Sequence, residues 1–451
     1  MKTYQDFSAI GTDERDRMQF CLTAVEEHKT DPVTKEAAIA QQYYEGLNVT
    51  ITTVDKFITD AYGQKIPDIW SPNHKIKSHL YPYFINQEVL YLLGNGISFS
   101  NEDTLEKLGK KFEKTVMELA VDALNGGAAF GFWNFDHLEG FKLTEFVPLY
   151  DEDTGRLMAG IRYWQLDNNK PLRMTLFETD GYTEYIKRKS EDITVYSEKK
   201  AYVQVVSQSA TGTEIAPGES YPGLPIIPLY NTNKKSAMYG NRETIDAYDL
   251  TVSKLVNNID NGEFIYWIIK NAPYMADEPD ELQAFIQKLR TSGVVALGDG
   301  QEVDQHKVDI PFQASDTTLS LLRGQLFTDF MAFDPLSIAS GAETATRIMA
   351  SYEPLNEKTD LFDYCVTDFI DGILEIAGIE DTPTYTRSMI VNKHEEAQLV
   401  IQAAQFMDSE YTTKKLLEIL GDADKVQEVL DRRQQEEAER FALAAGMTDE
   451  G

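Results

Sequence analysis

The sequence predicts an α+β fold, and three observations lead to this prediction. Apolar residues recur at helical spacing through much of residues 1–45 and again from about residue 242 onward. Between residue 128 and about residue 230 the period changes to two, which is typical of strands joined by hairpin turns. The chain has 451 residues, 42% hydrophobic and 26% charged, enough for two or three packed units. We therefore expect an α+β first half and a mainly helical second half.

The first 125 residues are predicted to be mainly helical. Residues 1–45 form polar helices, and "QQYYEGLNVTI" (41–51) is expected to run from a helix into an extended strand. The next helix should end at Leu93, because Gly94-Asn95-Gly96 stops it before a short strand. Apolar spacing predicts a further helix over 104–125 that ends in the same way, at a pair of glycines.

A long helix is expected over residues 242–271, ended by Pro273. At about 1.5 Å per residue it would be about 45 Å long. Its apolar residues alternate in threes and fours, which is the spacing that packs a helix along a neighbour. This seam contains Ile245, Tyr248, Val252, Leu255, Ile259, Gly262, Tyr266 and Ile269, and a second apolar set contains Leu250, Val256, Phe264 and Ile268.

The remainder of the second half is expected to alternate helices with short connections. Ser315 or Asp316 would cap the helix that ends before Asp334-Pro335. A small, nearly uncharged loop follows, and Pro354 should kink the helix after it. The expected order is a small mixed insert (272–312), a helix (313–334), a loop (335–345), a region that contains the kinked helix (346–384) and a helical tail (385–451). The kinked helix itself is expected to run from about Ala342 to Ala377, because Gly378 stops it.

Composition excludes several classes of protein. The net charge of −32 repels nucleic acid at long range, so a DNA-binding protein with the usual basic patch is excluded. Cys21 and Cys365 are too few for a disulfide framework and fit a reducing compartment. The first residues lack the apolar core of a signal peptide, and the longest apolar run, "FIYWII" (264–269), is too short to cross a membrane.

No motif for catalysis, a metal or a cofactor is found. There is no P-loop and no G-x-S-x-G, and His394-Glu395 lacks the second His of a zinc helix, because residue 398 is Gln. We therefore expect no enzyme and no cofactor. One alternative is a soluble carboxylate-dependent hydrolase, with or without a metal ion, which requires a pocket holding two or more acids of raised pKa. Another is an acidic interaction scaffold without a channel.

Five segments in the right order resemble the portal proteins of tailed bacteriophages, especially those of long-tailed phages of Gram-positive hosts. Together the segments cover most of residues 40 to 380. They are "QQYYEGLNVTI" (41–51), "INQEVLYLLGNGISFS" (85–100), "ALNGGAAFGFWNFD" (123–136), "LPIIPLYNTNKKSAMYGNRETIDAYDLTVSKLVNNID" (224–260) and "SIASGAETATRI" (337–348).

The resemblance implies a portal fold with seven parts. These are a wing (1–238), stem helix 1 (239–271), a clip (272–312), stem helix 2 (313–334), a tunnel loop (335–345), a long wing helix (346–384) and a crown (385–451). It also implies a ring of twelve subunits at one capsid vertex of the virion, assembled in the host cytoplasm. The implied partners are double-stranded DNA, the terminase large subunit, the head-tail adaptor, and the major capsid and scaffolding proteins, with no membrane.

The resemblance also implies three groups of site residues. The DNA-facing tunnel loop would contain Leu336, Ser337, Ile338, Ala339, Ser340, Gly341, Ala342 and Glu343. The channel-lining stem would contain Asp246, Asp249, Lys254 and Arg323. The clip surface that meets the adaptor and terminase would contain Glu278, Asp280, Glu281, Gln283, Asp299, Gln301 and Glu302.

The charges of these segments favour a wall that lets DNA slide. Acidic residues outnumber basic ones on the two stem helices, and a dense lattice of Lys and Arg would hold phosphates instead. The loop from residue 335 to 346 has no basic residue, while Glu343 is acidic. We therefore expect steric contact with DNA through Ile338 and no phosphate grip.

Overall fold

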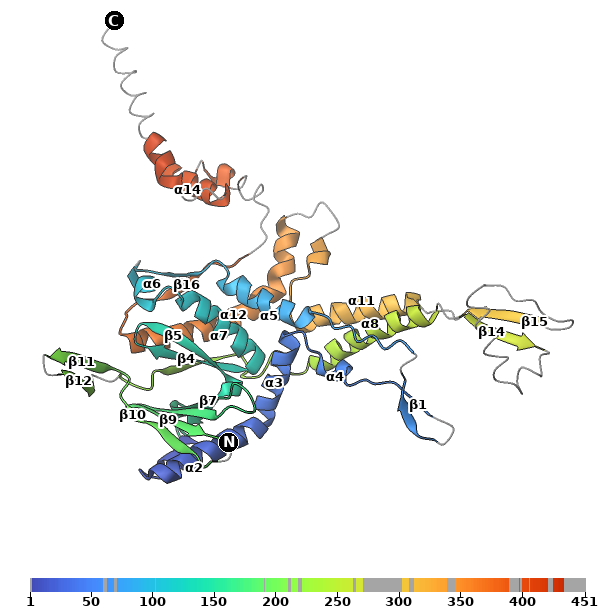
Figure 1. Cartoon of the computed structure of the whole chain (residues 1–451). Helices are drawn as coiled ribbons and strands as arrows, with labels where there is room; N and C mark the ends of the chain where they lie inside the picture. Colours follow the sequence, from blue (N-terminus) through green and yellow to red (C-terminus); the bar gives the residue numbers. More distant parts are fainter. Residues whose placement is uncertain are drawn as a thin grey trace, which may run out of the picture.

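The protein is described by a computed structural model. The structure describes residues 2–59, 63–68, 71–101, 103–189, 191–209, 212–217, 221–262, 265–270, 302–307, 312–338, 345–388, 397, 400–404, 406–420 and 425–433. Figure 1 shows a body of helices and strands from which a long arm projects. Two helices side by side form the first part of this arm, α8 (Arg242–Gly262) and α11 (Phe312–Asp329). The α+β fold class predicted from the sequence is confirmed.

The arm continues as a two-stranded ribbon, which corrects one prediction. The helix expected over 242–271 ends at Gly262, and β14 (Ile265–Lys270) follows it and pairs antiparallel with β15 (Glu302–Lys307). A short run of aromatic and β-branched residues fits a strand as well as a helix, and the partner strand decides between them. The helix α11 begins at Phe312, so Ser315 and Asp316 lie inside it and do not cap it.

The N-terminal helices α1 (Tyr4–Ser8), α2 (Glu14–Thr30) and α3 (Pro32–Tyr44) form as predicted. The side chains of Asp13 and Asp31 accept hydrogen bonds from the first free amides of α2 and α3. The strand expected after residue 45 is absent. Asn48 instead caps a helical turn, α4 (Val49–Thr52), by accepting hydrogen bonds from the amides of Thr50 and Ile51.

Three further helices build the body beside a short strand. The helix α5 (Leu80–Leu93) ends at the predicted residue, and β3 (Ile97–Phe99) follows it. The helix expected over 104–125 is divided into α6 (Asp103–Leu108) and α7 (Phe112–Gly126). Gly109 separates them with a φ of 88°, a left-handed conformation that glycine adopts at no steric cost.

The strands predicted between 128 and 230 form two main antiparallel sheets. One has the order β13-β4-β5 and the other β10-β9-β8-β7-β6. Their strands are β4 (Ala128–Asn134), β5 (His137–Lys142), β6 (Phe146–Tyr150), β7 (Leu157–Trp164), β8 (Leu172–Glu178), β9 (Gly181–Lys187), β10 (Thr194–Lys200) and β13 (Ile226–Tyr230). The short helix η1 (Leu143–Glu145) joins β5 to β6. Two hairpins project from the body, β1 (Phe57–Thr59) with β2 (Lys65–Pro67) and β11 (Gln204–Ser209) with β12 (Gly212–Pro217).

The helix α12 (Ala345–Ala377) crosses the body, contains Pro354 and ends at the predicted residue, Ala377. It lies directly on β4, since a Cβ at Gly131 would come within 2.5 Å of the ring of Phe369. The main hydrophobic core lies between α5, α7 and α12, and a second core lies between α2 and the five-stranded sheet. After α12 the strand β16 (Pro383–Tyr385) pairs with β3, and α14 (Ser409–Leu420) belongs to the tail. No described helix is long and apolar enough to cross a membrane.

Candidate functional site

The helix α8 buries a polar edge against an extended segment, residues 73–79, which we call the strap. Asp249, Ser253 and Asn257 lie one turn apart on this edge and are all buried. Their side chains accept hydrogen bonds from the amides of Ser78 (3.0 Å), Ile76 (2.9 Å) and His74 (2.7 Å), in that order. Three regular hydrogen bonds therefore hold the strap antiparallel along the arm helix.

This contact corrects the prediction for Asp249. Its side chain is 1% exposed and also accepts a hydrogen bond from the Asn48 amide (2.8 Å), so it is enclosed by its own chain and cannot line a channel. Burial raises the pKa of Asp249, while the hydrogen bonds from Ser78 and Asn48 oppose that shift. Of the other residues predicted on α8, Asp246 accepts a hydrogen bond from the Tyr43 hydroxyl (2.5 Å), and Lys254 is exposed.

Arg323, predicted to line the channel, is held by an ion pair at the base of the predicted loop. Its guanidinium donates two hydrogen bonds to Asp334, at 2.6 and 2.7 Å, and lies over the ring of Phe327. Asp334 in turn accepts a hydrogen bond from the Leu336 amide (2.9 Å). The hydrogen bond from Arg323 lowers the pKa of Asp334, which keeps this carboxylate charged. Arg323 therefore fixes the start of the loop, and its charge is already neutralised within the chain.

The exposed face of α11 presents small polar side chains and one large apolar one, Leu321, which is 70% exposed. The hydroxyls of Thr317, Thr318 and Thr328 donate to carbonyls four residues earlier in the helix, at 2.8, 2.9 and 2.9 Å. These donors are therefore not free for a phosphate. The charged side chains that the described part of α11 exposes are acidic, Asp316 and Asp329. This face is suited to a polyanion that has to pass without being held.

An aromatic stack joins the two ends of the segment that contains the predicted loop. The ring of Phe333 lies 4.1 Å from that of Tyr352 at an interplanar angle of 7°, and Tyr352 stacks on Tyr91 at 5.7 Å. The Gln87 side chain donates to the Phe333 carbonyl (2.9 Å) and accepts from the Phe333 amide (3.0 Å). We call Phe333, Tyr352, Tyr91 and Gln87 the clasp. It holds residues 333 and 352 together at the body.

A buried ion pair lies beside the clasp. Lys358 on α12 lies 2.5 Å from a carboxylate oxygen of Glu88 on α5 and donates to the Phe330 carbonyl (3.2 Å) just after α11. Glu88 is 1% exposed, so water stabilises its negative charge very little and the ammonium group of Lys358 has to balance it. One lysine therefore ties together α5, α12 and the end of α11.

Most of the predicted loop and clip lies outside the described residues. Leu336 is 64% exposed in a short helical turn, η2 (Pro335–Ile338), whose last residues are Ser337 and Ile338. Ala339, Ser340, Gly341, Ala342 and Glu343 of the loop, and Glu278, Asp280, Glu281, Gln283, Asp299 and Gln301 of the clip, lie outside the described residues. Glu302 is the first residue of β15.

Sequence reasoning did not single out the clasp or Lys358. The clasp joins residues that are up to 265 positions apart, from Gln87 to Tyr352. Each of these two, like Tyr91, fits the sequence pattern of its own helix, so the sequence gives no sign of the contact between them. The sequence did contain one sign of the ion pair. Lys358 lies among the apolar residues of α12, and a lysine on the packed face of a helix needs a partner.

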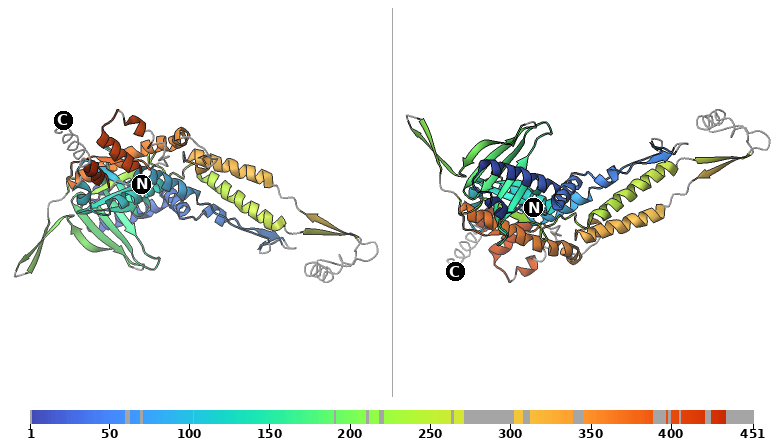
Figure 2. Two further views of the ribbon diagram at one scale, coloured as in Figure 1. Left: turned by 90° about the horizontal axis from the view of Figure 1, so that it is seen from above. Right: turned by 90° about the horizontal axis from the view of Figure 1, so that it is seen from below.

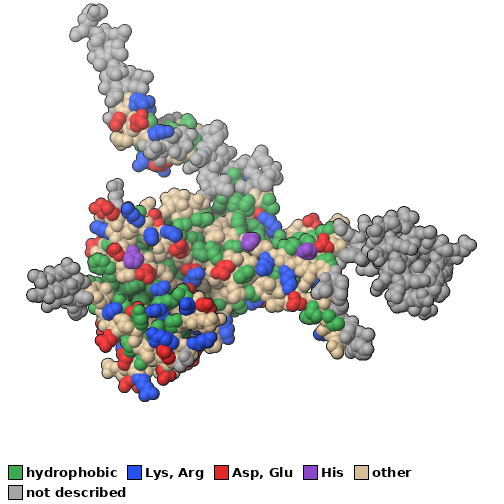
Figure 3. Space-filling model, in the orientation of Figure 1, with side chains coloured by type: hydrophobic (Ala, Val, Ile, Leu, Met, Phe, Trp, Pro, Cys, Tyr) green, Lys and Arg blue, Asp and Glu red, His purple; other side chains and the backbone are tan. Residues whose placement is uncertain are grey.

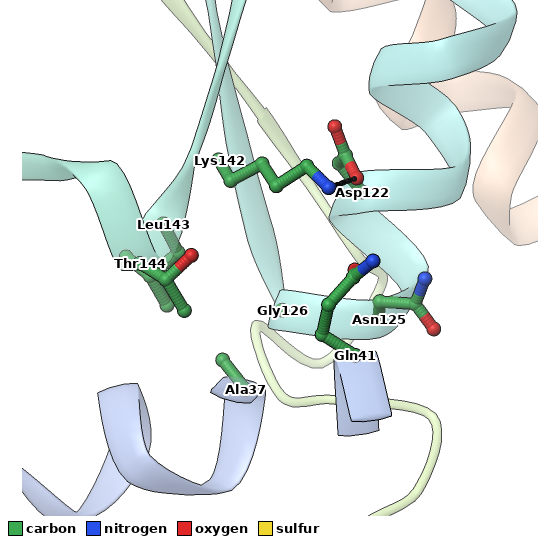
Figure 4. Close-up of a pocket in the computed structure, with 8 residues that line it drawn as sticks. All are labelled: Ala37, Gln41, Asp122, Asn125, Gly126, Lys142, Leu143 and Thr144. Carbon is green, nitrogen blue, oxygen red and sulfur yellow. Dashed lines mark ion pairs between the residues drawn. The ribbon is translucent and has the colours of Figure 1, made fainter. Parts of the chain in front are cut away.

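Two hollows of the described surface do not fit the hydrolase alternative. Figure 4 shows the first, between α3, α7 and β5, with a volume of about 10 Å³ and a single acid, Asp122, which lies 3.6 Å from the Lys142 ammonium. The second, of about 430 Å³, also holds a single acid, Glu380. The described residues contain no group of three or more possible metal ligands. A pair of acids in one pocket, which the hydrolase requires, is not found in either hollow.

Replacing Asp122 by Asn should remove part of the pH dependence of stability. Burial raises the pKa of Asp122 to about 6, although Lys142 opposes the shift. A raised pKa means that Asp122 favours folding below its unfolded pKa, and that this contribution is lost as the pH rises from about 4 to about 6. The loss amounts to about 2–3 kcal/mol for a shift of this size. Asp122→Asn should therefore flatten the curve measured by urea unfolding between pH 4 and 7.

The control for this experiment is Asp167→Asn, which removes an exposed acid in the turn between β7 and β8. Its curve should keep the slope of the unsubstituted protein. The prediction fails if Asp122→Asn and Asp167→Asn change the slope equally.

Comparison with known proteins agrees with the resemblance found in the sequence. The sequence model of the family described as "Phage portal protein, SPP1 Gp6-like" matches residues 35–440. A protein named "Portal protein" from Clostridium phage phiCD119 is 23% identical over 350 residues, which cover 71% of this chain and 74% of that protein. Among solved structures, a chain in the neck of an empty GTA particle has a TM-score of 0.43 at 11% identity, covering 74% of this chain and 88% of that chain. A chain in the virion of a native gene transfer agent particle has the same TM-score at 12% identity, covering 74% of this chain and 87% of that chain.

Proposed function

The chain belongs to the SPP1 Gp6-like family of phage portal proteins, and we propose that its subunits form a ring whose central channel passes double-stranded DNA at one vertex of the capsid. The observation that carries the proposal is the family match over residues 35–440. In this ring the protein packages, retains and releases DNA, and it has an assembly role and no catalytic one. The proposed ring has twelve subunits.

The arm is the proposed channel segment. It projects as two packed helices, and the exposed face of α11 carries acidic and small polar side chains together with Leu321. We assign the channel wall to this face, with the exposed Lys254 on α8 beside it. Asp246 is left out because it accepts a hydrogen bond from Tyr43 and pairs with Arg242. Asp249 is left out because it is buried, and Arg323 acts through its ion pair with Asp334.

The loop at residues 335–345 is the proposed point of contact with DNA. Leu336 is exposed beside the clasp, and Arg323 and Gln87 fix the backbone that leads into the loop. The described residues on both sides of the loop are therefore fixed to the body. We propose that the loop seals sterically against the duplex through Leu336 and Ile338.

The remaining assignments extend the family resemblance. Residues 272–312 are the proposed docking surface for the terminase large subunit and later for the head-tail adaptor. The body meets the major capsid and scaffolding proteins. The ring is assembled in the host cytoplasm and remains in the virion.

The experiment is to purify the chain and examine its assembly by electron microscopy and analytical ultracentrifugation. Closed rings with an open centre are expected, alone or when the other head proteins are present. The same preparation should restore DNA packaging to heads that lack their portal. A monomer or dimer that forms no ring under either condition would overturn the proposal.

Adding lysines to the exposed face of α11 should make the channel hold DNA. We expect Thr317→Lys with Ser320→Lys to strengthen DNA binding to isolated rings and to steepen its salt dependence, since each phosphate neutralised adds about one unit to the slope. Packaging should slow for the same reason. Filter binding at several salt concentrations and the amount of DNA packaged per head are the measurements.

The matched control is Thr30→Lys with Gln42→Lys, which adds the same charge at exposed residues of α2 and α3 on the body. Its rings should bind DNA as the unsubstituted rings do. If the two double variants change DNA binding equally, α11 does not line the channel.

A further inference from the structure

The outer face of α12 carries acidic and apolar residues in one stripe. Two large apolar side chains are unusually exposed near its centre, Tyr364 (72%) and Leu361 (55%). Apart from the adjacent pair Asp360 and Leu361, successive members are three or four residues apart, which places them on one side of the helix. The acidic members are Glu353, Glu357, Asp360, Asp368, Asp371 and Glu375. We call these eight residues the α12 stripe.

The stripe is poorly compensated within the chain. Asp360 is paired with Arg387, while the other five acids form no ion pair with the residues that the structure describes. Burial and repulsion from Asp368 raise the pKa of Asp371. Acids three and four residues apart on a helix repel one another, so a partner bearing positive charge would relieve the repulsion.

A basic cluster lies on α6 and α7. Lys107, Lys110, Lys111 and Lys114 are all exposed at the end of α6 and the start of α7, and Lys114 is paired with Glu118 in its own helix. Lys107 lines one hollow together with Ala377 and Glu380, so the cluster begins near the end of α12. Figure 2 shows the body that contains these helices from above and from below. Lys and Arg side chains gather on the face around α6 and α7 in Figure 3. In a chain of net charge −32, such a cluster is a local exception.

We propose that the α12 stripe of one subunit docks on the basic cluster of the next subunit around the ring. The inference rests on the proposed ring. Because the two surfaces differ, the contact is head-to-tail, the kind that closes into a ring when the rotation fits. Tyr364 and Leu361 are the apolar centre of the contact, and the acids and lysines form its charged rim.

Charge reversal tests the contact. Asp368→Lys with Asp371→Lys should raise the concentration at which half of the subunits are in rings at least about tenfold, because close like charges across an interface cost more than the 1.4 kcal/mol that a tenfold change requires. Sedimentation velocity over a concentration series is the measurement, and circular dichroism checks folding. Asp153→Lys with Asp167→Lys makes the same change of charge at exposed acids away from α12 and should leave assembly unchanged.

A second pair of changes makes the test specific. Lys110→Glu with Lys111→Glu should also weaken the ring, and combining it with the Asp368 and Asp371 reversals should restore assembly to within about threefold of the unsubstituted chain, since the attraction is rebuilt with opposite sign. Tyr364→Ser should weaken assembly without any change of charge.

The two proposals fail separately. If the unsubstituted chain forms no ring, the proposed function fails. If it forms rings that the Asp368 and Asp371 reversals leave unchanged, or if the combined variant gains nothing, the ring stands and the docking of α12 on the lysine cluster is overturned.

Discussion

Replacing Lys358 by Met is expected to lower the free energy of unfolding by about 3–5 kcal/mol. The substitution keeps the length of the side chain and removes its charge. Glu88, which is 1% exposed, would then keep a buried negative charge without its partner at 2.5 Å. The Phe330 carbonyl would lose a hydrogen bond as well. Chemical unfolding followed by circular dichroism at pH 7 measures the loss.

The matched control is the double variant Glu88→Leu with Lys358→Met. Replacing both members of a buried ion pair by apolar residues of similar size is commonly neutral or stabilising. The double variant should therefore recover most of the stability that the single one loses. A single variant as stable as the unsubstituted chain would show that Glu88 is neutral or solvated in the native protein, contrary to its position in the core.

Replacing Phe333 by Ala is expected to cost about 3–5 kcal/mol of stability and to release the ends of the loop from each other. Phe333 is 3% exposed and stacks closely on Tyr352, so its removal leaves a cavity between the end of the α11 segment and α12. We expect filled heads built with this variant to lose DNA at a lower temperature. The release of DNA on heating, followed by nuclease digestion, is the measurement.

A loss of stability could by itself weaken the heads, so the control variant must lose a similar amount of stability at a site away from the clasp. Phe130 is fully buried between the sheets, in a different core cluster, and Phe130→Ala should cost a similar amount. If the clasp has a specific role, Phe333→Ala releases DNA earlier than Phe130→Ala does. If both variants release DNA at the same temperature, the clasp contributes to stability only as ordinary core packing does.

The sequence predicted the regular elements of the body well. The end of α5 at Leu93, the change to strands at residue 128 and the presence of Pro354 within a long helix all follow from local rules of spacing and of glycine and proline. Two errors have physical causes. Residues 265–270 form a strand because a distant strand at 302–307 pairs with them, and residues 49–52 form a helical turn because Asn48 caps it.

The candidate site was less predictable, because its main contacts join residues far apart in the sequence. Asp249 was expected to line a channel, since an Asp in an amphipathic helix normally faces solvent. Its true surroundings, Asn48 and Ser78, lie about 170 to 200 positions away in the chain. In the same way, the partner that neutralises Arg323 could not be identified from spacing alone, although Asp334 is only 11 positions away.

The hydrogen-bonding groups of the strap and those of α8 repeat at nearly the same distance along the two segments. Alternate residues of an extended chain are about 6.6 Å apart, and helix residues four apart are about 6 Å apart, so the two sets of hydrogen-bonding groups stay in step for only a few repeats. Three bonds between 2.7 and 3.0 Å use that short range of agreement. Inserting or deleting a single residue between His74 and Ser78 would put every later pair out of step and would place Lys75 or Lys77 against the buried edge. We therefore expect relatives to vary freely in length at the tip of the β1–β2 hairpin and to keep the length of this segment constant.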